Sequence, residues 1–393
     1  MAINFKMIES KTGQQTNSML PVTEQFIQEA LNRGLKPTGI GLFIIQHLLD
    51  DTECFIRTLG QFGFQIRKVI GIEYSSKSKV VERLREQDID VILPQFSELE
   101  ITVKHALKSE LKKTSKESVF RFLIHEVGGY CAPFLGDDVD FLAEKCIGIV
   151  EETKQGLWRY RDIGFLPLPV MQIADSKLKG VEAKYVGEAV ARAVESDLLE
   201  LGVSLCNCCI GLLGFGDIGA SIATSLRCRG TVVSCYDPNP LKVIDAKMQG
   251  FACPGREYVL KESKLIIGAS GMNSVIYDEL SILRDNAMLV SVSSRDLEFP
   301  VKQITMASHR STHLTRFVSE FTMPWGKRIR IANCGFPVNF RGPSLPLFVS
   351  DLLFCQIAAC MMKLITQHLP PDIHCLSADE EKLIAKLWLE CYA

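Results

Sequence analysis

The stretch CCIGLLGFGDIGAS, Cys208 to Ser221, decides the fold of the second half of the chain. Its apolar run predicts a buried strand over Cys209 to Leu213, which leads directly into Gly214, Gly216 and Gly219. In a dinucleotide-binding turn, the first glycine permits a sharp bend and the second leaves room for a pyrophosphate. The third lets the following helix pack closely on the strand. The spacing therefore predicts a dinucleotide site at this turn.

The acidic residue that such a turn needs is Asp237. A helix is predicted over Ala220 to Arg227 and a strand over Val232 to Tyr236, so that Asp237 stands at the end of the second strand. A carboxylate there can accept hydrogen bonds from both ribose hydroxyls and would repel a 2′-phosphate, which favours NAD over NADP. From the turn itself, the residues expected to contact NAD are Gly214, Phe215, Gly216, Asp217, Ile218 and Gly219.

Strands and helices alternate through most of the chain. After the turn, strands are predicted at KLIIGAS, AMLVSVSS and RIRIANCG, which is the rhythm of a doubly wound sheet. Before it, the same alternation runs from a helix around Phe55 to the strand FRFLIHEVGG. The last part, from Leu345 to Ala393, reads as two helices separated by HLPPD. The sequence predicts an α/β protein with a Rossmann-type NAD-binding domain over 187–342, a preceding α/β substrate domain over 1–186, and a helical return over 343–393.

Composition narrows the classes of partner. The 393 residues carry 44 Lys and Arg against 46 Asp and Glu, a net charge of −2, which offers no basic field for nucleic acid or anionic lipid. The N-terminus has charges where a signal peptide needs an apolar core. The apolar run from Leu345 to Ile365 is interrupted by polar residues and reads as a buried helix rather than a membrane span. We expect a cytoplasmic protein that acts on a small molecule and binds neither nucleic acid nor membrane.

Two groups of residues raise the possibility of a metal site. The CNCC segment, Cys206 to Cys209, has no second pair at finger-like spacing. His309 and His313 could share one helix face, but no acidic base accompanies them as in an HExxH motif. No metal is expected.

Several blocks resemble the S-adenosylhomocysteine hydrolase family. They are GFGDIG with its acidic strand end, GIVEETKQGLWRYRD from Gly148, IADSKLKG from Ile173, QHLLDDTECF from Gln46 and IANCGFPVNF from Ile331. The resemblance covers nearly the whole chain. It implies that the N-terminal part and the helical return form one split substrate domain, and that the protein is a homo-oligomer, a dimer or tetramer. The family's reaction begins with hydride transfer from a ribose carbon of the substrate to NAD, followed by elimination and addition of water.

The resemblance also implies roles for single residues. Lys179 matches the lysine that helps deprotonate the substrate hydroxyl, and Glu152 matches the carboxylate that holds the sugar hydroxyls. His47 matches a histidine near the scissile bond, and Thr153 matches a cofactor-contacting threonine. The remaining expected cofactor contacts, on the nicotinamide side, are Ala269, Ser270 and Asn333.

Other family positions are replaced. Two aspartates of the family's pocket fall on Val127 and Ala183, and two histidines fall on Ser294 and Phe340. Glu126, beside Val127, could turn into the pocket in its place. Because acids and bases of this kind each contribute about two to four decades of rate, ordinary hydrolysis of S-adenosylhomocysteine is not expected.

Three hypotheses follow. The first is an enzyme that keeps NAD and oxidises, eliminates or hydrolyses another hydroxyl-bearing substrate. The second is a catalytically weakened NAD-binding homologue that regulates or scaffolds a partner. The third is a dehydrogenase of the 2-hydroxy-acid type, for which Arg295 with Glu298 is a partial match without the required histidine.

Overall fold

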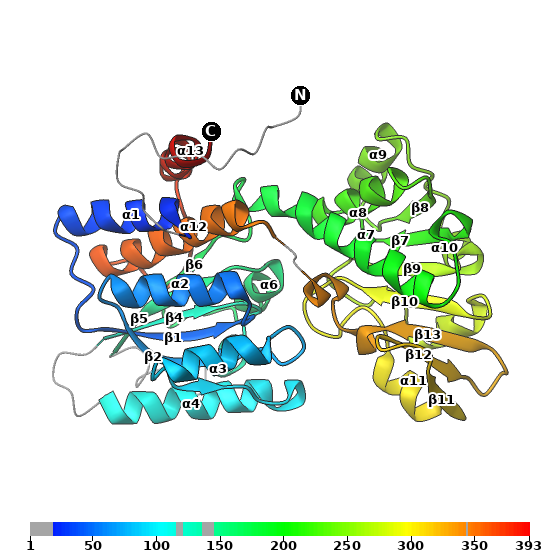
Figure 1. Ribbon diagram of the computed structural model, residues 1–393, viewed down its shortest axis with the longest axis horizontal. Coiled ribbons are helices and arrows are strands. Elements are labelled where there is room, and N and C mark those ends of the chain that lie inside the picture. The colour runs from blue at the N-terminus through cyan, green and yellow to red at the C-terminus, as the bar shows by residue number, and fades with distance from the viewer. Residues whose placement is uncertain (1–18, 115–120, 136–144, 343–344) are drawn as a thin grey trace. The chain divides into compact units, whose positions relative to one another are not determined.

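The computed structural model describes residues 19–114, 121–135, 145–342 and 345–393. The residues before 19, on which the signal-peptide expectation rests, lie outside this part of the chain. Two compact units are present: residues 1–180 with 346–393, and residues 181–345 (Figure 1). The sequence-based boundaries stood at 186/187 and 342/343. The C-terminal segment thus packs with the N-terminal unit.

The first unit is built on a seven-stranded sheet in the order β14-β6-β5-β4-β1-β2-β3, in which every neighbouring pair is parallel. Its strands are β1 Ile40–Gln46, β2 Gln65–Gly71, β3 Val91–Ile92, β4 Arg121–Glu126, β5 Cys146–Glu151, β6 Val170–Gln172 and β14 Ile373–Cys375. Its helices are α1 Pro21–Asn32, α2 Asp50–Gln61, α3 Ser78–Glu86, α4 Leu99–Thr114, α6 Lys154–Asp162, α12 Leu347–Thr366 and α13 Ala378–Tyr392.

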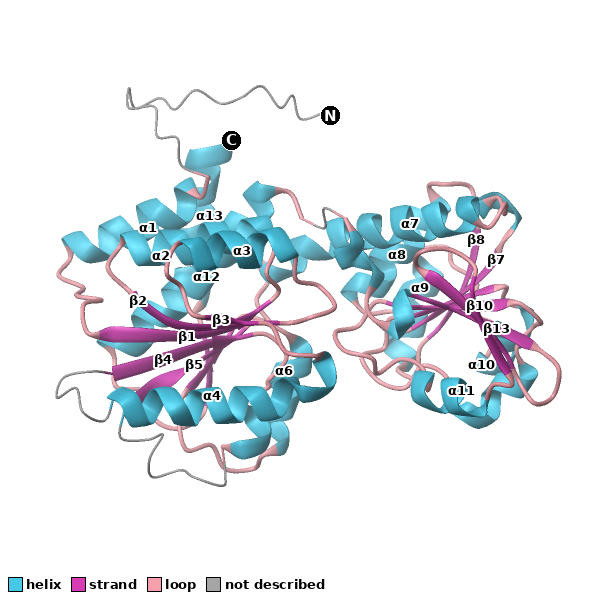
Figure 2. Ribbon diagram, turned by 60° about the horizontal axis from the view of Figure 1, so that its bottom comes forward, coloured by secondary structure: helices cyan, strands magenta, loops and turns pink. Residues whose placement is uncertain are grey.

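Helices cover both faces of this sheet, with α1, α2, α3 and α12 on one side and α4 and α6 on the other (Figure 2). Side chains alternate between the faces, so Leu42 and Ile44 of β1 pack under the first group while Phe43 and Ile45 pack under the second. Burial on both faces explains why these strands read as unbroken apolar runs.

Helix α12 is the most apolar element of the chain. It is long and apolar enough to cross a membrane, with a mean hydropathy of 1.7, but 83% of its apolar window is buried inside the protein. Asp351 in its first half accepts hydrogen bonds from the backbone N–H groups of Val22 and Thr23, both at 2.9 Å, and from the Tyr392 hydroxyl. Leu347–Thr366 is therefore a core helix of the first unit, as its interrupted apolar pattern predicts.

The second unit contains a seven-stranded sheet in the order β11-β12-β13-β10-β9-β7-β8. Its strands are β7 Cys209–Leu213, β8 Val232–Tyr236, β9 Leu265–Gly268, β10 Ala287–Ser291, β11 Arg310–His313, β12 Val318–Thr322 and β13 Arg328–Ala332. Its helices are α7 Glu182–Glu200, α8 Asp217–Arg227, α9 Pro240–Met248, α10 Arg256–Glu262 and α11 Val301–Ala307.

The strands β8, β7, β9, β10 and β13 are parallel to one another. Strands β12 and β11 are added antiparallel at the β13 edge of the sheet. Strand β8 lies on one side of β7, and β9, the next strand along the chain, lies on the other side. Doubly wound sheets bind their ligands at such a change in strand order. The antiparallel pair also corrects one sequence-based idea: His309 precedes β11 and His313 ends it, so they do not share a helix face. Among the described residues, no group of three potential ligands could hold a metal ion.

Candidate functional site

Polar side chains gather where three adjacent strands of the first unit end. In the sheet, β1 lies beside β4 and β4 beside β5, with Ile45 opposite Glu126 and Glu126 opposite Glu151. Because side chains alternate, Gln46, His125 and Glu152 share the face covered by α2 and α12. The carboxyl edge of a parallel sheet is the usual place for a ligand site in α/β folds.

Glu152 is the centre of this cluster. Its Oε1 accepts a hydrogen bond from Gln46 Nε2 at 2.6 Å and lies 2.5 Å from His125 Nε2. Burial alone would raise the pKa of Glu152, but the hydrogen bond and charge of His125, together with the charge of Lys179, outweigh burial and lower the pKa. Glu152 is therefore a buried carboxylate that stays ionised at neutral pH.

The second oxygen of Glu152 is differently placed. Within the described part of the chain, no hydrogen bond reaches Oε2, and Glu152 keeps 7% of its surface exposed. One oxygen is thus held by the protein, and the other is available to a hydroxyl group from outside.

His47 follows β1 and lies close enough to Glu152 and Lys179 to feel both charges. Its Nδ1 is 2.5 Å from Ser75 Oγ, and that hydroxyl donates to the Ile72 carbonyl at 3.1 Å, so Nδ1 carries the hydrogen. Burial lowers the pKa of His47 to about 4, the charge of Glu152 opposes this, and that of Lys179 adds to it. His47 is therefore neutral at physiological pH.

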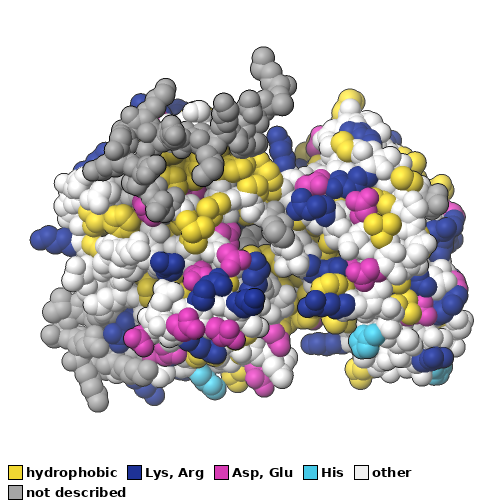
Figure 3. All heavy atoms as spheres, in the orientation of Figure 1, with side chains coloured by type: hydrophobic (Ala, Val, Ile, Leu, Met, Phe, Trp, Pro, Cys, Tyr) yellow, Lys and Arg dark blue, Asp and Glu magenta, His cyan; other side chains and the backbone are white. Residues whose placement is uncertain are grey.

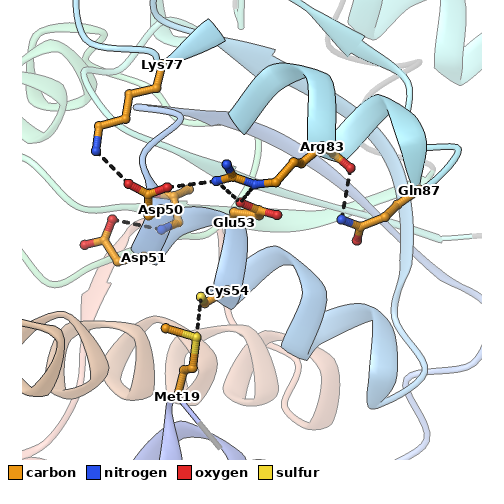
Figure 4. A network of polar contacts seen from close by, with 9 residues as sticks. Met19, Asp50, Asp51, Glu53, Cys54, Lys77, Arg83 and Gln87 are labelled. Atoms are coloured by element: carbon orange, nitrogen blue, oxygen red, sulfur yellow. Dashed lines mark hydrogen bonds and ion pairs between the residues drawn. The ribbon is translucent and has the colours of Figure 1, made fainter. Parts of the chain in front are cut away.

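A network of ion pairs fixes α2, which begins just after His47 (Figure 4). Asp50 at its first position pairs with Lys77 at 2.6 Å and with Arg83 at 2.8 Å, and Arg83 also donates to Glu53 at 2.7 Å. These contacts tie the first turn of α2 to α3. The turn that they fix follows directly on the loop that carries His47.

Two more buried carboxylates occupy the opposite face of the same strands. Glu126 accepts hydrogen bonds from the Tyr160 hydroxyl and the Cys131 N–H, and Glu151 accepts from the N–H groups of Gly128 and Gly129. Burial, and for Glu126 also the charge of Glu151, raises their pKa values to about 8 and about 7. Glu126 therefore does not turn toward Glu152, because strand alternation sends its side chain to the other face.

Thr153, expected at the cofactor, acts as the N-cap of α6. Its Oγ1 accepts from the Gly156 N–H at 3.1 Å and donates to Glu151 at 2.7 Å. A Cβ at Gly156 would lie 2.1 Å from the Glu151 carboxyl carbon, so the helix start and the carboxylate are packed directly together. These contacts make Thr153 part of the scaffold under the Glu152 strand.

In the second unit, the glycine turn connects β7 to α8. Gly214 has φ +101°, and a Cβ there would lie 2.5 Å from the Ala269 carbonyl oxygen. A Cβ at Gly219 would lie 2.1 Å from the Gly214 carbonyl oxygen, whereas around a Cβ at Gly216 there is open space for at least 4 Å. The turn thus leaves room at the helix N-terminus, where free N–H groups favour a pyrophosphate.

Asp237 lies next to this room. Its Oδ2 accepts from the Phe215 N–H at 2.7 Å and its Oδ1 from the Asn239 N–H at 2.8 Å, which orients the carboxylate beside the turn. Asp217 and Ile218 are the first two residues of α8. The turn and Asp237 therefore fit NAD, with the turn at the pyrophosphate and Asp237 at the adenosine ribose.

The other expected cofactor residues lie on loops that are held by the protein itself. Ala269 follows β9, and its N–H bonds to the Leu213 carbonyl at 2.8 Å. Ser270 donates to buried Glu298 at 2.8 Å, and Asn333, in a left-handed conformation with φ +49°, donates to the Pro337 carbonyl at 3.0 Å. Ala269 and Ser270 border the glycine turn, because their backbone atoms are the nearest neighbours of a Cβ placed on Gly214.

The structure thus brings together Glu152, His47 and Lys179 in one unit, and the turn, Asp237, Ala269 and Ser270 in the other. Sequence reasoning missed Gln46 and His125. A signal was present for both, because each is a polar side chain at or near the end of an otherwise apolar run, in β1 and β4.

The family-model comparison agrees with the assignment of an NAD site to the glycine turn. Residues 192–343 match the family model described as the NAD-binding domain of S-adenosyl-L-homocysteine hydrolase. An S-inosyl-L-homocysteine hydrolase from Methanopyrus kandleri is 25% identical over 385 residues, covering 94% of this chain and 86% of that protein. An adenosylhomocysteinase from Thermoplasma acidophilum is 24% identical over 365 residues, covering 90% and 86%. A dipicolinate synthase from Bacillus halodurans aligns in structure with a TM-score of 0.47 at 11% identity, over 84% of this chain and 99% of that one.

Proposed function

Because this chain is a divergent, NAD-binding member of the S-adenosylhomocysteine hydrolase family, we propose that it starts its reaction by hydride transfer from a hydroxyl-bearing substrate. The substrate class is a nucleoside or another small metabolite with neighbouring hydroxyl groups. Ordinary hydrolysis of S-adenosylhomocysteine is not its reaction in this proposal, and NAD, when bound, supplies the hydride acceptor.

The arrangement of Glu152 carries the proposal. A buried, ionised carboxylate with one oxygen held by Gln46 and His125 and the other without a hydrogen bond in the described structure suits the hydroxyl groups of a vicinal diol. Charge-assisted hydrogen bonds from hydroxyl groups to a carboxylate are short and about twice as strong as neutral ones. Glu152 would therefore orient the carbon that loses hydride.

Two neighbouring groups can manage protons. When a hydroxyl carbon is oxidised, its oxygen must lose a proton, and a general base must lie within hydrogen-bond reach of it. Lys179 and His47 are both electrostatically coupled to Glu152, and His47 is uncharged at neutral pH and able to accept a proton. In our proposal, Lys179 assists removal of the hydroxyl proton, and His47 acts near the bond of the substrate that is cleaved.

A second candidate function is that of an NAD-binding regulatory or scaffold protein. It is supported by the replacement of polar residues of the family's pocket. Val127 and Ala183 are buried apolar side chains at 3% and 6% exposure, where the family's pocket has aspartates. Loss of these groups removes proton-transfer capacity without affecting the glycine turn. If no hydroxylated substrate reduces the bound NAD, this candidate takes precedence.

The third candidate, a 2-hydroxy-acid dehydrogenase, is disfavoured by the contacts of Glu298. Its carboxylate accepts hydrogen bonds from the hydroxyl groups of Ser270, Ser274 and Ser293 and from the Gly271 N–H. A glutamate used in this way holds the loop after β9. It is not placed to assist a catalytic histidine.

The test begins with purified full-length protein, from which any bound nucleotide is released by denaturation and identified. The NAD-loaded protein is then mixed with adenosine, inosine and a panel of hydroxylated metabolites, and reduced nicotinamide is followed by absorbance. Reduction by the wild type and its loss in Lys179→Ala support the enzyme. Absence of reduction with every compound refutes it.

The remaining expectations extend the proposal: a cytoplasmic homo-oligomer that binds neither nucleic acid nor membrane. The face in Figure 3 carries interspersed Lys, Arg, Asp and Glu side chains, in line with the net charge of −2. Sedimentation of the purified protein measures its oligomeric state.

A further inference from the structure

We propose that His125 is a positioning residue for Glu152, holding one carboxylate oxygen in place so that the other receives the substrate hydroxyls. The inference rests on the proposed role of Glu152 and adds a residue that lies outside the family blocks described above. It follows from the contacts of His125, from the second donor on the same oxygen, and from the unusual burial of the imidazole.

The contact between His125 and Glu152 is short and enclosed. Nε2 of His125 lies 2.5 Å from Glu152 Oε1, and His125 has no exposed surface. The ring of Phe55 meets the imidazole in an edge-on arrangement, with centroids 5.9 Å apart, and stacks on Phe354 of α12 at 4.4 Å. The aromatic cover excludes water, which makes the hydrogen bond stronger than it would be at the surface.

A second donor fixes the same oxygen. Gln46 Nε2 donates to Glu152 Oε1 at 2.6 Å, while Gln46 Oε1 accepts from the His47 N–H at 2.8 Å. Gln46 is therefore anchored at both ends. Rotation of the Glu152 carboxylate would break the bonds to Gln46 and His125 together, so the orientation of Oε2 is set by two residues on adjacent strands.

The burial of His125 has a stability cost. In the described residues, its Nδ1 is buried and has no hydrogen-bond partner. The neighbouring positions on this face of the sheet are apolar: Leu123 of β4, Ile44 of β1 and Val150 of β5. Packing alone would favour an apolar side chain at position 125, since a buried polar atom without a partner is unfavourable. The contact with Glu152 is what distinguishes histidine there.

The first experiment measures the Glu152 carboxyl group directly, in protein labelled with carbon-13 at the Glu side-chain carboxyl. Its NMR signal is assigned by its loss in Glu152→Gln. His125→Leu removes the donor, His125→Gln keeps an N–H donor, and His105→Leu, an exposed position on α4, is the matched control. We expect the Glu152 pKa to rise in His125→Leu, because less of the effect of burial is offset, to rise less in His125→Gln, which keeps an N–H donor, and to stay at the wild-type value in His105→Leu. An unchanged pKa in His125→Leu overturns the proposal.

The second experiment separates a positioning role from a structural one. Thermal denaturation should show that His125→Leu is still folded at the assay temperature, while reduction of bound NAD by the most active hydroxylated compound falls by about 100-fold, the loss typical of a misplaced reacting group. Partial recovery in His125→Gln supports positioning. A lower midpoint in His125→Leu with unchanged reduction overturns it. If the wild type reduces NAD with no compound, the proposed function fails, whereas the Glu152 titration still decides the role of His125.

Discussion

Two glycines of the same turn should respond in opposite ways to alanine. In Gly219→Ala, the new Cβ would lie 2.1 Å from the Gly214 carbonyl oxygen, about 1 Å closer than such atoms approach in ordinary packing. The obstacle is backbone, so α8 must move away from β7. Overpacking of this kind costs about 1 to 3 kcal/mol or more, and we expect the upper end.

Gly216→Ala differs in both respects. Gly216 has φ −76° and ψ −171°, which alanine adopts without strain, and a Cβ there meets nothing within 4 Å. Its effect on stability should lie within about 1 kcal/mol of zero, since a lower entropy of the unfolded chain offsets a poorer N-cap. The methyl group, however, enters the room that we assign to the pyrophosphate.

The assay combines thermal denaturation with calorimetric titration of NAD. For a unit of this size, about 3 kcal/mol lowers the midpoint by about 6–12 °C, which we expect for Gly219→Ala. Gly216→Ala should melt as the wild type does without ligand, bind NAD much more weakly, and lose the increase in midpoint that NAD confers. Wild-type NAD affinity in Gly216→Ala would exclude a pyrophosphate beside Gly216, and a wild-type midpoint in Gly219→Ala would show that α8 does not pack on the Gly214 carbonyl as described.

Three further predictions concern stability. Asp351→Ala should destabilise the first unit by about 2 to 4 kcal/mol, because backbone N–H groups of α1 lose their acceptor, and chemical denaturation measures the loss. Arg341→Ala should cost about 3 to 5 kcal/mol by leaving buried Asp197, 2.6 Å away, without its ion-pair partner; the cost should shrink in the double variant with Asp197→Ala. Glu126 and Glu151 have raised pKa values, of about 8 and about 7 against 4.5 for an ordinary Glu, so their protonated forms stabilise the fold below pH 4.5 and this contribution is lost as the pH rises through 7 to 8. The thermal midpoint of Glu126→Gln should therefore rise relative to that of the wild type as the pH increases from 4.5 to 8. A difference between the two midpoints that does not change with pH would contradict the raised pKa of Glu126.

Two strands of the second unit could be predicted from sequence. The strands β7 and β8 occupy the residue ranges that the apolar runs indicated, because Gly214 ends the first run and Gly230 precedes the second, which limits where each strand can lie. The antiparallel pair β11 and β12 was missed. All four residues of β11 are exposed, so the strand has no apolar alternation to detect.

The substrate side was harder to predict. Glu152 and Lys179 could be singled out through a family resemblance, but the partner of Glu152 could not. His125 lies 27 positions before Glu152, and only the pairing of β4 with β5 brings them together. Likewise, the side to which Glu126 points depends on strand register, which residue types alone do not fix.

In the proposed function, Glu152 orients the hydroxyl groups of a substrate that reduces the bound NAD. This role is tested by rapid mixing of NAD-loaded protein with the hydroxylated panel, comparing wild type, Glu152→Gln and, as a control, Glu98→Gln at an exposed position of the first unit. We expect reduced nicotinamide to form with at least one compound in the wild type and in Glu98→Gln, and about 100-fold more slowly in Glu152→Gln. Equal rates in all three proteins, or no reduction by any compound, would contradict this role.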